Sequence, residues 1–187
     1  MTKQIKAIML GASGVGKTSI INAFLKVNKE NVESTLRYDL YYFRGSIDGV
    51  DFSINLWDVP GQTQYAPMTQ TFLRNTDIAL IVYDITSEDS FDRVDSDYKL
   101  LMEETLNANV LIIGNKCDLE SERKILQTVG ENYADQISAQ FFEASAKYQT
   151  NTAEIFEALQ LIASKVEKPV VDNLDITKSK EEKKGCC

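Results

Sequence analysis

Histidine is absent from the chain, and acidic residues outnumber basic ones. Lysine and arginine together number 20 against 28 aspartates and glutamates, which gives a formal net charge of -8. Proteins that bind nucleic acid concentrate positive charge on the surface that meets the phosphates. This balance of charge argues against nucleic acid as the main partner.

Cysteine and long apolar runs are also scarce. The chain has three cysteines in 187 residues, Cys117, Cys186 and Cys187, and they do not form the pattern of a disulfide framework. No apolar stretch approaches the length of a membrane-spanning helix, and residues 1–4 show no sign of a signal peptide. The hydrophobic fraction of 43% is ordinary and the length suits one domain. We therefore expect a soluble intracellular domain.

Residues 11–18 are the most informative segment. They read GASGVGKT and fit G-x-x-x-x-G-K-[ST], the phosphate-binding P-loop. A run with strand character precedes them, and residues 18–26 follow with apolar side chains at helical spacing. Glycines let the loop turn its N–H groups inward, and the helix adds the positive end of its dipole. The alternative is a chance glycine turn before a helix.

The P-loop motif assigns a role to each of its later residues. Lys17 can reach the outer phosphates of a nucleotide, and the Thr18 hydroxyl can ligate Mg²⁺. The residues expected to hold phosphates are Ser13, Gly14, Val15, Gly16, Lys17, Thr18 and Ser19.

Residues 115–118, NKCD, indicate which base is bound. They follow the apolar run 110–114, which is typical of a buried parallel strand. The Asp118 carboxylate can accept hydrogen bonds from guanine N1–H and the 2-amino group, a donor pair that adenine lacks. Asn115 can tie this loop to the P-loop, and the Lys116 stem can lie along the base. An ordinary polar loop after a strand is the alternative.

Two further segments end predicted strands with polar residues. In residues 54–62, Asp58 can hold Mg²⁺, usually through water, while the Gly61 N–H can bond a γ-phosphate and Gln62 can orient the attacking water. In residues 141–147, the strand leads into Ser145, Ala146 and Lys147, where the Ala146 N–H can meet the guanine carbonyl oxygen. Each motif is weak evidence alone. The prediction rests on finding all four motifs in this order, each at the end of a predicted strand.

With these four motifs, the chain resembles a small GTPase of the Ras superfamily, and more narrowly the Rab family, over roughly residues 3 to 167. Residues 80–86 (LIVYDIT), Trp57 before the magnesium aspartate, and the ending Gly185-Cys186-Cys187 favour Rab. The resemblance implies a membrane-traffic switch that cycles between GDP and GTP with Mg²⁺. It also implies a monomer with effectors, an exchange factor, a GTPase-activating protein and a GDP-dissociation inhibitor. Its expected place is the cytoplasmic face of an intracellular membrane, in exchange with the cytosol.

The two switch segments of the family are altered here. In switch I (residues 34–40), Thr35 matches the threonine that completes the Mg²⁺ shell in the GTP state. Arg37 replaces a small residue of most Rabs and is the one candidate for an arginine that acts in cis. In switch II, the segment that follows Asp58, Pro60 stands where alanine is usual, and proline fixes φ and removes an N–H. We therefore expect this hinge to be stiffer than is usual in the family.

The resemblance also predicts an effector surface. Leu40, Trp57 and Phe72 match the hydrophobic triad through which Rabs contact effectors. Plain packing is the alternative, and for Phe72 it is equally good. A partner surface is the better interpretation for Trp57, which precedes a site residue in a strand that joins the switches.

Strands and helices are predicted to alternate, with a hairpin turn at Asp48-Gly49. This pattern predicts an α/β fold of the P-loop GTPase type, with a mostly parallel six-stranded sheet, one antiparallel hairpin strand and helices on both faces. Strands are expected over about 4–11, 39–46, 52–58, 78–85, 109–115 and 140–145, and helices over about 17–26, 65–74, 88–107, 124–138 and 152–166.

The pattern stops near residue 168. We expect a GTPase domain over 1–167 and a flexible tail over 168–187. Cys186 and Cys187 could be an accident or a redox pair, but beside a Rab-like domain double prenylation is the better interpretation. Stable anchoring usually takes two signals, and glutamates interrupt the lysines of the tail.

Two rival functions remain for the whole chain. One is a GTP-loaded binding scaffold that hardly hydrolyses GTP because its switches are altered. The other is a P-loop phosphotransferase such as a nucleoside kinase, which would have no need of the NKCD and SAK motifs.

Overall fold

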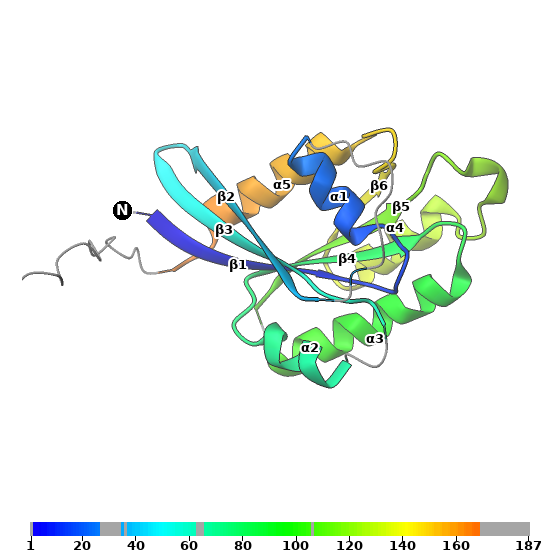
Figure 1. Cartoon of the computed structure of the whole chain (residues 1–187), viewed down its shortest axis with the longest axis horizontal. Coiled ribbons are helices and arrows are strands. Elements are labelled where there is room, and N and C mark those ends of the chain that lie inside the picture. The colour runs from blue at the N-terminus through cyan, green and yellow to red at the C-terminus, as the bar shows by residue number, and fades with distance from the viewer. Residues whose placement is uncertain (1, 27–34, 36, 63–65, 106, 169–187) are drawn as a thin grey trace, which may run out of the picture.

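The computed structural model describes residues 2–26, 35, 37–62, 66–105 and 107–168, with the side chains of 66–69 left aside (Figure 1). A six-stranded sheet runs through the described part, in the order β2-β3-β1-β4-β5-β6. All neighbouring pairs are parallel except β2 and β3, which form an antiparallel hairpin. The strands are β1 (Thr2–Leu10), β2 (Asp39–Ile47), β3 (Val50–Asp58), β4 (Ile78–Asp84), β5 (Asn109–Asn115) and β6 (Gln140–Ala144). The predicted fold class is confirmed.

The hairpin between β2 and β3 turns at the predicted residues. Ile47 pairs with Val50, which leaves Asp48 and Gly49 as a two-residue loop. Both loop residues have positive φ, 51° and 77°, the conformation of a type I′ turn. Asp-Gly suits this turn because aspartate tolerates the left-handed region and glycine enters it freely.

Helices cover both faces of the sheet (Figure 1). The helix bounds are α1 (Lys17–Phe24), α2 (Ala66–Leu73), α3 (Glu88–Glu104), α4 (Gln127–Gln136) and α5 (Thr152–Lys165), with a short 3₁₀ turn, η2, at Glu120–Glu122. One core packs alternate side chains of the strands against α1 and α5, and a second packs the opposite side chains against α2, α3 and α4. β4 is buried along its whole length, as expected of a central parallel strand.

Helix ends depart from the predictions by a few residues. α3 ends three residues before the predicted position, because Thr105 takes an extended conformation (φ -155°, ψ 125°). The predicted helix 124–138 is shorter and follows η2, and Arg123 just after η2 pairs with Glu143 and Glu120. At its start α3 has the Ser87 side chain as its cap, which accepts a hydrogen bond from the Ser90 N–H.

The carboxyl ends of the parallel strands meet at one edge of the sheet. The loops after β1, β3, β4, β5 and β6 all leave from this edge, the usual ligand-binding position of an open α/β sheet. In the part of the chain described, no helix has both the length and the apolar character to cross a membrane. Lys168 Nζ pairs with Asp77 Oδ2 at 2.5 Å, and residues 169–187 lie outside the described residues, so the boundary at 167/168 stays a prediction.

Candidate functional site

The loop between β1 and α1 forms a backbone cradle. Gly16 caps α1 with a φ of 97°, and its carbonyl accepts the Ile20 N–H at 2.9 Å. A Cβ on Gly16 would lie 2.2 Å from Asn115 Nδ2, so both the conformation and the space require glycine here. The predicted phosphate residues, Ser13 to Ser19, all lie in this loop and the first turn of α1. The helix N-terminus therefore points its free N–H groups at one place, which suits a phosphate.

Lys17 folds back over the same loop. Its ammonium donates to the carbonyl oxygens of Gly11 and Ala12, both at 2.9 Å, and the residue is buried. Burial lowers the pKa of Lys17 to about 8, with Asp58 acting in the opposite direction. At neutral pH the group is mainly charged, so a desolvated cation stands ready for an anionic ligand.

Three oxygen-bearing side chains converge beside Lys17. Thr18 Oγ1 lies 2.6 Å from Thr35 Oγ1 and 2.5 Å from Asp58 Oδ2. These residues come from α1, from switch I and from the end of β3. The predicted metal ligands are therefore brought together.

This cluster fits a hard divalent cation. Two hydroxyls and a carboxylate are oxygen ligands of the kind that Mg²⁺ prefers. Asp58 Oδ1 is buried and has no hydrogen-bond partner within the described residues, although buried polar atoms normally have one. Burial raises the pKa of Asp58, while Thr18 and Lys17 lower it. A cation held by Thr18, Thr35 and Asp58 would satisfy the unpaired oxygen.

Gly61 packs directly against the P-loop. A Cβ at this position would lie 2.4 Å from the Ala12 carbonyl carbon and 2.5 Å from the Ser13 nitrogen. Its backbone is therefore placed beside the phosphate cradle, as its predicted role requires. Pro60 before it is buried and Gln62 after it is half-buried.

Asn115, the last residue of β5, connects three parts of the site. Its Nδ2 donates to the Val15 carbonyl at 2.8 Å, and its Oδ1 accepts the Ala146 N–H at 3.1 Å. The first contact confirms the predicted tie to the P-loop. The second gives the Ala146 N–H, predicted to meet the guanine carbonyl oxygen, a hydrogen-bond acceptor within the protein.

Asp118 is held by the neighbouring loop. The Ser145 hydroxyl donates to Asp118 Oδ1 at 2.6 Å, and Ser145 Oγ itself accepts the Tyr148 N–H at 3.2 Å. Parallel pairing of Asn115 with Ala144 brings the two loops side by side. One oxygen of Asp118 is thus fixed by the protein, which orients the carboxylate.

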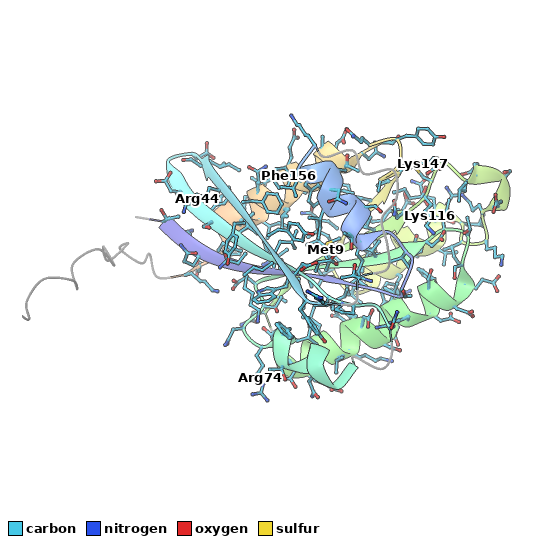
Figure 2. The ribbon with its side chains drawn as sticks, viewed as in Figure 1. Met9, Arg44, Arg74, Lys116, Lys147 and Phe156 are labelled. Carbon is cyan, nitrogen blue, oxygen red and sulfur yellow. The ribbon has the colours of Figure 1, made fainter. Side chains whose placement is uncertain are left out.

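Lys116 and Lys147 lie at the same end of the molecule (Figure 2). Lys116 has a left-handed backbone (φ 68°), and its ammonium pairs with Asp84 Oδ2 at 2.5 Å. Asp84 Oδ1 in turn accepts the N–H and hydroxyl of Thr86. Burial opposes the charged form of Asp84, but Lys116 and Thr86 outweigh it and lower its pKa. Lys147 Nζ lies 5.0 Å from the centre of the Tyr148 ring.

Asp84 is a site residue that sequence reasoning missed. Its signal was present, because it ends the apolar strand β4 just as Asp58 ends β3 and Asn115 ends β5. Because Asp84 holds the Lys116 ammonium, the apolar stem of that lysine stays available for its predicted place along a base.

The predicted effector residues lie together between the switches. Leu40 on β2 is directly opposite Trp57 on β3, and the Trp57 ring lies 5.0 Å from that of Phe72 on α2. Tyr38 of switch I stacks on Phe72, with ring centres 4.2 Å apart and planes 11° apart. Tyr38 was not predicted here, and its ring covers part of the surface assigned to a partner.

Two charged residues of α3, Arg93 and Asp97, also reach the site and were missed. Arg93 Nη1 donates to the Gly61 carbonyl at 2.6 Å. By contrast, Arg37, the candidate for an arginine in cis, is exposed.

The lipidation candidates Cys186 and Cys187 lie outside the described residues.

Comparison with known proteins agrees with this geometry. The model of the Ras family matches residues 6–165. Ras-related protein Rab-13 from Mesocricetus auratus is 36% identical over 157 residues, which cover 82% of this chain and 77% of the relative. Ras-related protein RabC from Dictyostelium discoideum is 31% identical over 189 residues, covering 97% and 96%. The chain therefore belongs to the Ras family of small GTPases, the enzymes that hydrolyse GTP to GDP and phosphate, and within it to the Rab proteins.

Proposed function

We propose that this chain is a guanine-nucleotide switch that hydrolyses GTP slowly and regulates membrane traffic. The observation that carries this proposal is the convergence of Thr18, Thr35 and Asp58 at hydrogen-bond distance. Thr18 belongs to the P-loop and Thr35 to switch I, while Asp58 ends β3 directly before switch II, so a ligand at their meeting point would link the phosphate site to both switches. Loss of a terminal phosphate would release them, which is how a phosphate-sensing switch works.

In this proposal each site residue has one task. The helix N-terminus and Lys17 bind the phosphates, and Asp118 selects guanine. Thr18, Thr35 and Asp58 would hold Mg²⁺, which would neutralise the negative charge that develops on the phosphates. The Gly61 N–H meets the γ-phosphate and Gln62 orients the water that attacks it. Intrinsic turnover should be on the order of 10⁻⁴ s⁻¹, as in Ras, so an activating protein should accelerate it.

Gln62→Leu is expected to slow single-turnover GTP hydrolysis and to leave GTP affinity nearly unchanged. The leucine keeps the bulk but cannot hold a water, and a misplaced reacting group costs on the order of 10²-fold. The matched control is Gln70→Leu, the same change at an exposed residue of α2 that bonds Glu104. Gln70→Leu should hydrolyse GTP at the parent rate.

The scaffold alternative is supported by specific features of the switches. Pro60 removes an N–H beside Gly61, and the Tyr38 ring stacks on Phe72 across the two switches. If parent and Gln62→Leu hydrolyse GTP equally slowly, with and without an activating protein, the chain is a GTP-loaded scaffold. A phosphotransferase is disfavoured because it would have no need of the NKCD and SAK motifs, whose residues Asp118 and Ser145 are joined by a hydrogen bond.

We further propose that the tail anchors the protein through prenyl groups on Cys186 and Cys187. Each buried CH₂ contributes about 0.8 kcal/mol, and stable anchoring takes two signals. Replacing both cysteines with serine is expected to move the protein from the membrane pellet to the cytosol, with nucleotide binding unchanged. Cys117→Ser is the matched control and should stay on the membrane. A double variant that still sediments with membranes contradicts the proposed anchor.

A further inference from the structure

Helix α3 carries a charged pair on the side that packs against the sheet. Its buried residues are Ser90, Val94, Asp97 and Leu101, which recur at helical spacing. Asp97 therefore occupies a position where an apolar side chain is normal. It is 7% exposed, and Arg93, one turn earlier, is its ion-pair partner at 3.3 Å.

The pair joins two parts of the phosphate site. The Arg93 guanidinium uses Nε to bond Asp97 and Nη1 to donate to the Gly61 carbonyl at 2.6 Å. On the other side, Asp97 faces the start of the P-loop: burial raises its pKa, whereas Arg93, Lys17 and the Gly11 N–H lower it. The Arg93 guanidinium is thus held by the Asp97 carboxylate and bonded to the backbone of switch II.

Stability alone does not account for this arrangement. Asp97 Oδ2 is buried and has no hydrogen-bond partner within the described residues, and buried ion pairs are often no more stabilising than apolar residues of the same size. The same helix has an ordinary surface ion pair, Lys99 with Asp95, whose side chains are 70% and 49% exposed. Arg93 and Asp97 differ from that pair by burial and by their contact with switch II.

The hydrogen bond from Arg93 to the Gly61 carbonyl also constrains the backbone of Gln62. A peptide unit is planar, so holding the Gly61 carbonyl also sets the direction of the Gln62 N–H and the position of its Cα. On the other side, the ring of Pro60 fixes its own φ. The backbone that leads to Gln62 is therefore constrained before and after Gly61, and Gly61 itself lies against Ala12.

We propose that Arg93 is a positioning residue for GTP hydrolysis: anchored by Asp97, it holds the Gly61 carbonyl and so places Gln62 against the attacking water. This proposal rests on the proposed function, in which Gln62 orients that water. Arg93 acts here through the backbone of switch II. Guanidinium geometry matters because lysine cannot supply two directed donors in one plane.

The test compares Arg93→Gln in the parent and in a Gln62→Leu background, using Mg²⁺-saturated single-turnover GTP hydrolysis and the GDP off-rate. In the parent, Arg93→Gln should slow hydrolysis on the order of tenfold or more, while the GDP off-rate stays unchanged. With Gln62→Leu, the same change should have no further effect, because both residues serve one step. Lys99→Gln is the matched control and should match the parent in both measurements.

Two further variants refine the result. Asp97→Asn should slow hydrolysis less than Arg93→Gln, because the arginine loses its anchor and keeps its carbonyl partner. Arg93→Lys keeps the charge, and should also be slow if the fork is what matters; it replaces Arg93→Gln if that variant fails to bind nucleotide.

Different failures have different meanings. Equal slowing by Arg93→Gln in both backgrounds overturns the positioning role, because Arg93 would then act independently of Gln62. An unchanged rate in Arg93→Gln, together with a slow Gln62→Leu, overturns the positioning role and leaves the proposed function standing. If Gln62→Leu hydrolyses GTP at the parent rate, the proposed function fails. The positioning role of Arg93 then fails as well, because Arg93 is proposed to act by placing Gln62.

Discussion

Asp118→Asn is expected to remove the preference for guanine nucleotides. The Asp118 carboxylate can accept hydrogen bonds from guanine N1–H and the 2-amino group. Hydrogen bonds to a charged group contribute about 1.5–3 kcal/mol each. Losing both corresponds to a fall in GTP affinity on the order of 10²–10⁴-fold, at about 1.4 kcal/mol per factor of ten.

The structure also indicates how the asparagine would sit. Because Ser145 Oγ donates to Asp118 Oδ1 at 2.6 Å, the asparagine oxygen would take that place and its NH₂ group would face the base. An amide there meets the guanine 2-amino group donor to donor. Xanthine carries a carbonyl oxygen at the same position, so affinity for xanthosine triphosphate should rise as affinity for GTP falls.

Titrating GTP and xanthosine triphosphate against both proteins measures this exchange. Asp135→Asn, the same change at an exposed residue of α4, is the matched control and should keep the parental preference. An Asp118→Asn protein that still prefers GTP would remove Asp118 from the base-binding site.

Gly61→Ala should prevent the close approach of switch II to the P-loop that the structure shows. The added methyl group would lie 2.4 Å from the Ala12 carbonyl carbon and 2.5 Å from the Ser13 nitrogen. These atoms are backbone atoms of the P-loop, which cannot shift without distorting the phosphate cradle. Switch II must then move away, and Gln62 moves with it, so we expect hydrolysis to fall on the order of 10²-fold or more.

GDP binding should survive the same substitution, since Gly61 serves only the γ-phosphate in the proposed function. The measurement is thermal stabilisation by GDP and by a non-hydrolysable GTP analogue. Gly61→Ala should lose the additional stabilisation by the analogue. Gly49→Ala is the matched control: it strains a positive φ at the hairpin tip, yet its methyl group meets nothing within 4 Å. Gly49→Ala should lower thermal stability and keep the additional stabilisation by the GTP analogue. If both variants behave alike, contact between the added methyl group and the P-loop does not explain the effect of Gly61→Ala.

The fold was predictable because its signals are local. Apolar runs such as 110–114 can be read as buried parallel strands, and Asp48-Gly49 fixes a hairpin turn by its own conformational preference. The end of α3 was placed three residues too late, because the extended conformation of Thr105 is set by its surroundings rather than by a strong local breaker.

The site was predictable where a motif holds all its residues in one short segment. Lys17 and Thr18 share the P-loop, and the chemistry of phosphate binding fixes their spacing. Arg93 is different, because its partner Gly61 is 32 positions away and meets it only after α3 packs on the sheet. The available signal was indirect: Asp97 is a charged residue at a position of α3 where the periodicity calls for an apolar one.

Trp57 is the only tryptophan in the chain. It stands one residue before Asp58, opposite Leu40 and in contact with Phe72. Its indole therefore touches the surroundings of both switches, and its environment must change whenever Phe72 or switch I moves. Indole emission depends on the rings and the water around it, so the protein carries an intrinsic fluorophore beside its two switch segments. Exchange and hydrolysis can then be timed in the unlabelled protein, without a dye or a modified nucleotide.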